Sequence, residues 1–223
     1  MPGLATLLPA TVAVAQCRGP ELPDGDVGLY PGEESVVSRA VPQRRREFTV
    51  ARSCARQGLR RLGAPAGAIG KGPAGEPQWP PGVVGSITHC AGYAAAAVAW
   101  ADHLRTVGID AEPDEPLPDG VLELTASPGE ITHLAALAAA DPRIHWGRLQ
   151  FCAKEAIYKA WYPVQQRWLG FDDVDVRLDP DGWFDARLLA PPVQGAEPFA
   201  HCRGRWCVDG GVLLAALSLP AVD

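Results

Sequence analysis

The sequence predicts an α+β protein, and three observations lead to this prediction. The chain has 223 residues, of which 47% are hydrophobic and 21% are charged, as is typical of globular proteins that bury a core. Strand patterns and helix patterns are segregated along the chain instead of alternating, which favours α+β over a doubly wound α/β fold. These patterns also fall into two halves of comparable size.

The first half is predicted to hold a strand, a long helix and a meander of strands. A strand at about residues 7–15 precedes a loop rich in proline, glycine and acidic residues. A helix follows from about Pro42 to Leu62, and Gly63 is suited to end it because glycine tolerates the left-handed conformation. Short turns separate the three predicted strands of the meander, at residues 84–88, 93–100 and 107–112.

The second half is predicted to begin with helices and to end with strands. A proline-rich connection at residues 113–120 leads into it. Ser127 and Glu130 have the spacing of a capping box with Pro128 at the first helical position, which predicts a helix to about residue 140. A further helix is predicted at residues 148–162, ended by Pro163. Strands are predicted at residues 174–178, 184–189, 203–208 and 212–219.

Charge and cysteine content narrow the class of protein. The formal net charge of −6 argues against a nucleic-acid partner, because proteins that follow phosphate backbones normally carry a basic excess. The mostly apolar stretches at residues 4–15 and 92–100 are shorter than the roughly 20 residues of a membrane span, so no membrane partner is expected. The six cysteines lack the spacing of a zinc site, so we expect reduced thiols in a cytoplasmic protein.

Two carboxylates on one predicted strand are the sharpest chemical signal. Side chains alternate along a strand, so Asp110 and Glu112 point to the same face. Their segment reads Val107-Gly108-Ile109-Asp110-Ala111-Glu112. A hard divalent cation such as Mg²⁺ takes oxygen ligands and would relieve the repulsion between them. Equally, the strand end emerges into solvent before Pro113, where adjacent acids are harmless, and the motif alone leaves both interpretations open.

The helix predicted at residues 148–162 carries a second charged cluster. Lys154, Glu155, Tyr158 and Lys159 fall on one arc of this helix, opposite an apolar side. A surface pair between Glu155 and Lys159, worth about 0.3–0.5 kcal/mol, is the common explanation of such spacing. It leaves unexplained why two of the three lysines lie here while arginine supplies the other cations. A compact ammonium suits a phosphate oxygen, which favours phosphate binding.

Arginines on the first long helix indicate an anion nearby. Arg44 and Arg52 border the apolar stripe of that helix in a helical projection. A cation near a helix N-terminus opposes the helix dipole, so the cluster around Arg44 is better explained by a bound anion. Arg45, Arg56 and Arg60 are expected to form an ordinary solvated face.

These motifs together resemble the surfactin-type family of 4′-phosphopantetheinyl transferases, in particular its actinobacterial branch. The family-like segments occur in order over most of the chain: Arg44-Arg45-Arg46-Glu47-Phe48 to Arg52, Lys71-Gly72, Trp79-Pro80, Gly85-Ser86-Ile87-Thr88-His89, the segment from Val107 to Glu112, and Phe151 to Lys159. The resemblance implies an enzyme that moves the phosphopantetheine arm of coenzyme A onto a serine of an apo acyl or peptidyl carrier protein, releasing 3′,5′-ADP. Ala111 departs from the pattern, because some relatives place there a side chain that touches the metal region.

The resemblance also implies an architecture and a metal site. Two similar α+β halves, residues 1–106 and 107–223, would be related by pseudo-twofold symmetry. Coenzyme A and Mg²⁺, or Mn²⁺ in its place, would lie in the cleft between the halves. Asp110, Glu112 and Glu155 would surround the metal.

Further roles come from the same resemblance. Arg44, Arg52 and His89 would hold the 3′-phosphate of coenzyme A. Glu155 would act as the general base toward the carrier serine, directly or through a water, with a metal-bound water as the alternative base and Lys159 as a second catalytic residue. The remaining contacts to coenzyme A would come from Lys71, Gly72, Ser86, Thr88, Asp110, Lys154 and Lys159.

Two other functions stay open from the sequence. A metal-dependent phosphodiesterase acting on coenzyme A or a nucleotide would use the same three acids. A non-enzymatic module would use the arginine helix to bind anions or nucleic acid, although no aromatic residues are interleaved with the basic ones. The resemblance itself implies a monomer that serves polyketide, nonribosomal peptide, siderophore or fatty-acid synthesis.

Overall fold

A computed structural model describes residues 3–19, 28–189 and 195–221 of the chain. The helices are α1 (Pro42–Leu62), α2 (Val121–Thr125), α3 (Pro128–Ala140), α4 (Trp146–Gln165) and α5 (Glu197–Ala200), with 3-10 helices at Leu4–Leu7, Glu34–Val37 and Phe171–Asp173. The strands are β1 (Ala13–Arg18), β2 (Gly70–Lys71), β3 (Pro77–Gln78), β4 (Val83–Cys90), β5 (Tyr93–Trp100), β6 (Leu104–Pro113), β7 (Val174–Asp179), β8 (Trp183–Leu188), β9 (His201–Asp209) and β10 (Val212–Pro220).

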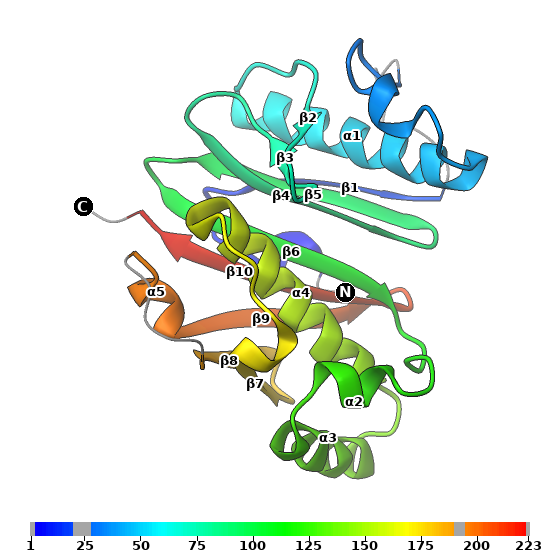
Figure 1. Ribbon diagram of the computed structural model, residues 1–223, viewed down its shortest axis with the longest axis vertical. Coiled ribbons are helices and arrows are strands. Elements are labelled where there is room, and N and C mark those ends of the chain that lie inside the picture. The colour runs from blue at the N-terminus through cyan, green and yellow to red at the C-terminus, as the bar shows by residue number, and fades with distance from the viewer. Residues whose placement is uncertain (1–2, 20–27, 190–194, 222–223) are drawn as a thin grey trace.

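Within the described residues, the strands form two main antiparallel sheets. The first has the order β1-β5-β4 and the second the order β6-β10-β9-β8-β7, while β2 and β3 form a short ribbon. Figure 1 shows α1 lying along the first sheet and α4 lying against the second, beside β6 and β10. This mixture of helices and antiparallel sheets confirms the predicted α+β class. The pseudo-twofold symmetry and the division at residue 106 stay predictions.

Strand β5 is buried on both faces because its side chains are small. Ala95, Ala97 and Ala99 face the core shared with the second sheet, whereas Ala94 and Ala96 face α1. All five are at most 3% exposed. A helix and a second sheet can therefore approach the two sides of one strand.

Helix α4 packs closely on β6 at Gly108. A Cβ at this position would lie 2.9 Å from the Cβ of Ala160 and closer still to the carbonyl oxygen of Ala156. Glycine is thus required by the close approach of helix and strand. The approach brings the α4 side chains against the strand that carries Asp110 and Glu112.

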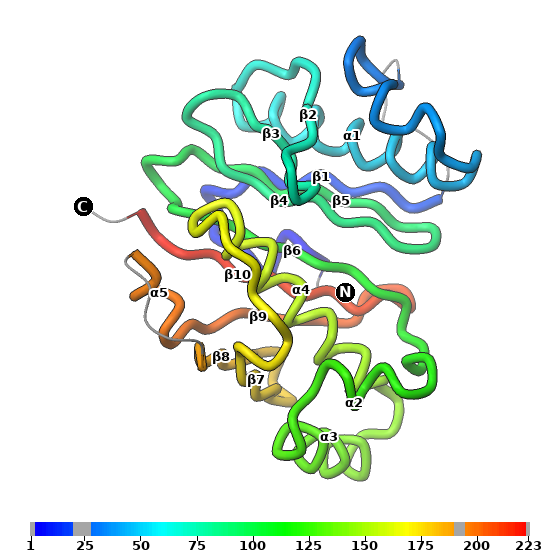
Figure 2. The backbone as a smooth tube through the Cα atoms, in the orientation of Figure 1, coloured from blue at the N-terminus to red at the C-terminus, as the bar shows by residue number. Residues whose placement is uncertain are grey.

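The two sheets meet where β4 lies beside β6, as the backbone trace in Figure 2 shows. Side-chain hydroxyls make hydrogen bonds between these strands. Ser86 Oγ accepts the backbone N–H of Ile109 at 3.1 Å, and Thr88 Oγ1 accepts that of Ala111 at 3.0 Å. The joint fixes the end of β4 opposite the acidic part of β6.

Several predicted boundaries agree with the structure and others differ by a few residues. Helix α1 has the predicted bounds, Gly63 ends it at φ 77°, and Ser127 and Glu130 form the capping box. The first strand begins only at Ala13, because a 3-10 helix and a turn at Pro9 precede it. Pro163 lies inside α4, which continues to Gln165 although proline cannot donate to the carbonyl four residues before it. No described helix is both long and apolar enough to cross a membrane.

Candidate active site

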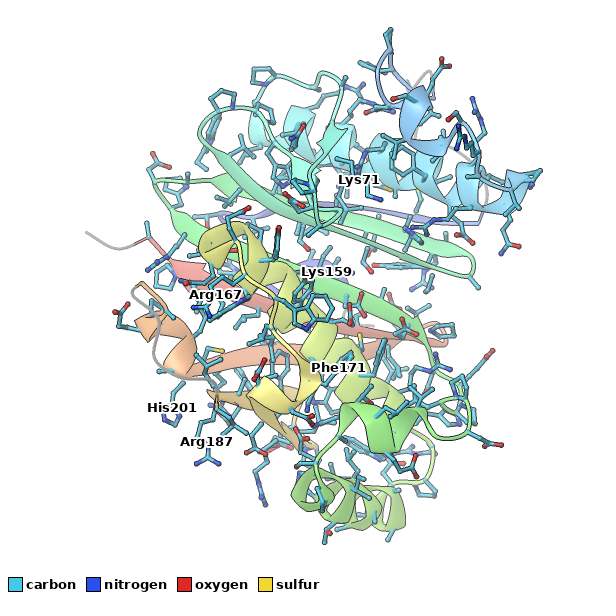
Figure 3. The ribbon with its side chains drawn as sticks, viewed as in Figure 1. Lys71, Lys159, Arg167, Phe171, Arg187 and His201 are labelled. Atoms are coloured by element: carbon cyan, nitrogen blue, oxygen red, sulfur yellow. The ribbon has the colours of Figure 1, made fainter. Side chains whose placement is uncertain are left out.

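Two adjoining pockets lie between the first half of the chain and α4. The first, of about 180 Å³, is lined from α1, β2 and β4, and the second, of about 260 Å³, is lined from β4 and α4. They adjoin because Gly75, Pro77 and Ile87 line both. Figure 3 labels Lys71, which lines the first pocket, and Lys159 of α4, which lines the second. The arrangement forms a continuous cleft that reaches from basic residues of α1 to charged residues of α4.

Asp110 lies beside the second pocket, where Lys159 and Thr88 contact it. Lys159 Nζ is 2.6 Å from Asp110 Oδ1, and the Thr88 hydroxyl donates to the same oxygen at 3.0 Å. The other oxygen, Oδ2, is buried without a hydrogen-bond partner. Burial alone would lower the pKa of Lys159, but the Asp110 carboxylate outweighs it and raises that pKa, so the ammonium stays charged. An uncompensated acceptor thus lies next to a fixed cation.

Glu112 is held by an arginine that sequence reasoning left without a role. Arg148 Nη1 donates to Glu112 Oε2 at 2.9 Å. Burial, and then the nearby Asp110 carboxylate, raise the pKa of Glu112, although Arg148 acts in the opposite direction. One available signal was the spacing of Arg148 and Glu155, because residues seven apart lie on the same side of a helix.

Glu155 projects from α4 and lines the second pocket. Burial raises its pKa, and the Asp110 carboxylate adds to the effect. The acids Asp110, Glu112 and Glu155 are therefore electrostatic neighbours. Burial, and then repulsion from Asp110, raises the pKa of both glutamates.

The described residues hold no group of three His, Cys, Asp or Glu side chains arranged as a metal site. Lys159 contacts Asp110 and Arg148 contacts Glu112, so each of the two strand acids is paired with a cation of α4. The donor chemistry still suits a hard divalent cation, which prefers carboxylate oxygens. The buried, unpaired Oδ2 of Asp110 is a free ligand atom for such an ion. The residues fit the group by chemistry, since Asp110 Oδ2 and the Glu112 oxygen that Arg148 does not engage could both serve as ligand atoms.

The first pocket is basic, and Arg44, Arg52 and His89, the residues expected to hold the 3′-phosphate, all line it. Arg52 is only 5% exposed, and its Nε is buried without a hydrogen-bond partner. Its guanidinium carbon lies 4.5 Å from the centre of the Phe48 ring. Burial lowers the pKa of Arg52 to about 10, which leaves it charged at neutral pH. Arg44 Nη1 contacts His89 Nε2 at 2.8 Å. Lys71 lines the same pocket, so three permanent cations, Arg44, Arg52 and Lys71, surround it.

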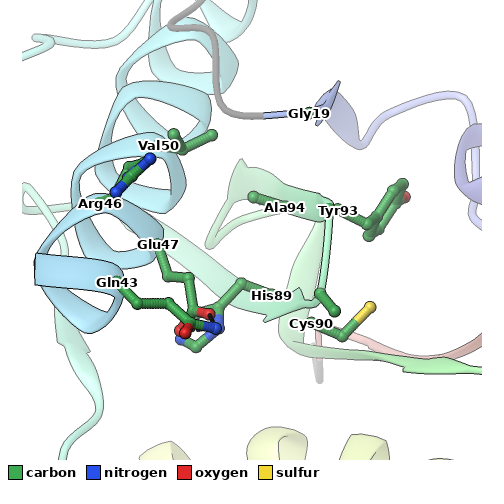
Figure 4. A pocket seen from close by; sticks show the side chains of 11 residues that line it. Gly19, Gln43, Arg46, Glu47, Val50, His89, Cys90, Tyr93 and Ala94 are labelled. Atoms are coloured by element: carbon green, nitrogen blue, oxygen red, sulfur yellow. Dashed lines mark hydrogen bonds and ion pairs between the residues drawn. The ribbon is translucent and has the colours of Figure 1, made fainter.

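His89 also lines a third pocket of about 370 Å³. Figure 4 shows its ring close to Gln43 and Glu47 of α1. Glu47 Oε2 is 3.9 Å from Nδ1, while burial and then Arg44 lower the pKa of His89. The imidazole is thus neutral and accepts a hydrogen bond from Arg44 at Nε2. In the same pocket, burial raises the pKa of Cys90 to about 12, so its thiol is protonated.

The expectation that Lys154 binds coenzyme A is wrong for this structure. Lys154 is 3% exposed, and its Nζ lies 2.9 Å from Glu130 Oε2 and donates to the Phe171 carbonyl at 2.9 Å. Consecutive helical residues differ by 100°, so Glu155 faces the pocket while Lys154 faces α3. Its ammonium neutralises Glu130, which also accepts hydrogen bonds from the Gln150 side chain and the Val176 backbone.

The expectation of a solvated Arg56 is also wrong. Arg56 is fully buried, its Nη1 lies 2.8 Å from both carboxylate oxygens of Glu33, and its guanidinium stacks on Tyr30 at 4.2 Å. Glu33 supplies the countercharge that makes this burial tolerable. Because the same carboxylate accepts the N–H of Ile69, the network anchors the segment before Lys71.

Of the other predicted residues, some line the cleft and others hold the backbone around it. Ser86 lines the second pocket and bonds to β6, whereas Thr88 contacts Asp110. Gly72 lies in the β2–β3 turn, where its N–H donates to the Glu76 carbonyl at 2.8 Å. It supports the loop that carries Lys71.

Comparisons with known proteins give consistent matches over the chain. Residues 32–99 match the family model for the 4′-phosphopantetheinyl transferase N-terminal domain, and residues 106–208 match the model for the 4′-phosphopantetheinyl transferase superfamily. The chain is 48% identical to the 4′-phosphopantetheinyl transferase Svp of Streptomyces mobaraensis, over 98% of this chain and 89% of the relative. It is 44% identical to PptT of Mycobacterium tuberculosis, over 97% of each protein, and 44% identical to Npt of Nocardia iowensis, over 96% of this chain and 99% of the relative. None of these matches supports the phosphodiesterase alternative.

Proposed function

Since this chain belongs to the 4′-phosphopantetheinyl transferase superfamily, we propose that it transfers the phosphopantetheine arm of coenzyme A to carrier proteins in the cleft between β4 and α4. The family uses coenzyme A as its substrate and generally depends on a divalent metal. One observation carries the assignment of the site: the cleft places a buried, unpaired arginine nitrogen in one pocket and a buried, unpaired aspartate oxygen beside the next. Such atoms call for a ligand that brings both anion and metal.

The 3′-phosphate of coenzyme A would occupy the first pocket. Arg44, Arg52 and Lys71 supply three cations there, and no carboxylate is among the described residues that line it. Neutral His89 accepts a hydrogen bond from Arg44 at Nε2 and would orient that guanidinium toward the phosphate. The free Nε of Arg52 supports this placement, because a phosphate oxygen would satisfy it.

The pyrophosphate would lie in the second pocket, near Lys159 and Ser86. Asp110, Glu112 and Glu155 would hold Mg²⁺ there, with Mn²⁺ as the alternative. The cation would neutralise phosphate charge, and it would offset the Asp110 repulsion that adds to burial in raising the pKa of both glutamates.

The transfer itself balances as a phosphoryl displacement. The oxygen of the carrier serine forms a bond to the phosphorus that bears pantetheine, the bond from that phosphorus to the bridging oxygen breaks, and 3′,5′-ADP leaves. Glu155 would take the serine proton, since a raised pKa makes a carboxylate a stronger base. Lys159 would stabilise the charge that develops on the phosphate oxygens.

Intact-mass spectrometry tests the proposal. An apo carrier protein incubated with this enzyme, coenzyme A and Mg²⁺ should gain about 340 Da, the mass of one phosphopantetheine arm. EDTA should abolish the gain. Carriers from polyketide, nonribosomal peptide, siderophore and fatty-acid pathways should be compared, because surface contacts decide the partner. An unmodified mass for every carrier, despite tight binding of coenzyme A, would contradict the proposed reaction.

A further inference from the structure

One arginine of α4 binds both the acidic end of β6 and the turn that follows it. Arg148 Nη1 donates to Glu112 Oε2 at 2.9 Å, Nε donates to the carbonyl of Glu115 at 3.3 Å, and Nη2 donates to the carbonyl of Pro116 at 2.6 Å. Its side chain is 16% exposed. All three nitrogens of the guanidinium are therefore engaged on one short segment.

His145, next to the start of α4, also holds the segment that Arg148 contacts. His145, the residue before α4, donates its backbone N–H to Asp114 Oδ1 at 3.0 Å, and its ring nitrogen Nδ1 lies 2.9 Å from the same oxygen. The backbone of Asp114 is in turn bonded to the carbonyl of Gly211. The segment around Asp114 is thus held from two sides, and Arg148 alone among these contacts reaches a proposed metal ligand.

We infer that Arg148 is a positioning residue that fixes Glu112 for metal binding. This inference rests on the proposed function. Arg148 engages Oε2 of Glu112, and a carboxylate has a second oxygen that can bind a cation. The positive charge also offsets repulsion between Glu112 and Asp110. Because Glu155 lies two turns further along α4, the contact ties Glu112 to the helix that carries another proposed ligand.

The geometry explains why arginine occupies this position. A guanidinium presents several N–H groups in a rigid plane and can serve a carboxylate and two carbonyls at once. A lysine ammonium would keep the charge but lose the planar fork. Arg148→Lys therefore separates the contribution of charge from that of geometry, and Arg148→Ala removes both.

The test measures the affinity for Mn²⁺ by electron paramagnetic resonance, with coenzyme A present. Arg148→Ala should weaken Mn²⁺ about tenfold or more, as is typical when a residue that orients a metal ligand is lost. Arg148→Lys should fall between this variant and the unmodified protein. In assays of transfer, kcat of Arg148→Ala should fall and excess Mg²⁺ should restore part of it. The KM for coenzyme A should stay nearly constant, because the pocket proposed for the 3′-phosphate does not include Arg148.

The matched control is Arg143→Ala. Arg143 is an exposed arginine that binds Asp141 at 2.8 Å, so its removal should leave metal affinity unchanged. Unchanged Mn²⁺ affinity in both Arg148 variants would overturn the inference. If circular dichroism shows that Arg148→Ala does not fold, Arg148→Lys decides the question in the same way.

Glu112→Gln separates this inference from the proposed function. If that substitution weakens Mn²⁺ binding but neither Arg148 variant does, Glu112 is a ligand and the role given to Arg148 is wrong. If Glu112→Gln leaves Mn²⁺ affinity unchanged, the proposed metal site is wrong and the inference falls with it.

Discussion

Arg44 and Arg52 line the same pocket but differ in burial, and this difference decides which of them is the better test of phosphate binding. Arg52 is buried among α1 neighbours, so its removal would also disturb packing. The Arg44 side chain is 54% exposed and reaches the pocket from the first turn of α1. Arg44 is therefore the cleaner probe of phosphate recognition.

We expect Arg44→Ala to raise the KM for coenzyme A about tenfold, because a hydrogen bond to a charged group contributes about 1.5–3 kcal/mol. The KM for 3′-dephospho-coenzyme A should not change, since that substrate lacks the phosphate. Arg45→Ala, on the exposed side of the same helix, is the control. An equal rise in KM for both substrates would show that Arg44 does not read the 3′-phosphate.

The ionised carboxylate of Glu155 should lower the stability of the folded protein. Burial, and then Asp110, raise its pKa in the folded protein above the value in the unfolded chain. The ionised carboxylate therefore destabilises the folded state at neutral pH, and this cost disappears as the pH falls from the raised pKa to the unfolded value.

Glu155→Gln should consequently raise the Tm of the metal-free protein by about 1–4 °C at neutral pH. The gain should shrink as the pH is lowered. Binding of coenzyme A should persist while transfer falls about 100-fold or more, as expected for loss of a general base. Calorimetry across pH and single-turnover mass spectrometry measure both effects. Retained turnover would remove Glu155 from the role of base.

At the scale of elements, α4 controls all three acids. It carries Glu155, contacts Asp110 through Lys159 and contacts Glu112 through Arg148. These contacts depend on the close approach of α4 to β6 at Gly108. The position of one helix relative to one strand thus sets the charge distribution of the site.

Gly108→Ala should separate α4 from β6 and destabilise the protein by about 1–3 kcal/mol, because the added methyl meets helix backbone that cannot move alone. Urea denaturation measures the loss. Gly129→Ala in α3 is the control: its added methyl has only ordinary contacts, so it should be neutral or stabilising. Equal stabilities for the two variants would contradict the packing argument.

The ion pair between α3 and α4 should act on stability and not on substrate binding. Lys154→Met leaves Glu130 buried without its countercharge and should cost about 3–5 kcal/mol in unfolding free energy. Lys71→Met, in the first pocket, should show the converse, with a raised KM for coenzyme A and nearly unchanged stability. A raised KM in folded Lys154→Met would return this lysine to the substrate site.

At the scale of the whole molecule, local sequence patterns predicted the elements but not their long-range partners. Pro42 and Gly63 bound α1 because their backbone preferences act within a few residues. The shared face of Asp110 and Glu112 follows from strand alternation in the same local way. By contrast, Glu33 binds Arg56 and Glu130 binds Lys154 across 23 and 24 residues, so no local rule showed that these cations are buried.

The joint between the two sheets was equally hidden from the sequence. Ser86 and Thr88 were predicted to lie on a strand and, from the resemblance, to contact coenzyme A, yet their hydroxyls bond to the backbone of β6. Their role depends on which strand lies opposite, which only the assembled fold defines. The sequence therefore indicated candidate residues for the site but not the contacts that these residues make.

The alanine-rich strand β5 has a consequence for how this protein can evolve. Each of its two faces belongs to a different core, one shared with α1 and the other with the second sheet. A larger side chain on either face would push apart layers that both contribute to the cleft. Mutational tolerance along β5 should therefore be narrow, and sequence drift in this enzyme should concentrate in strands such as β7 and β8 that have one face free of such packing.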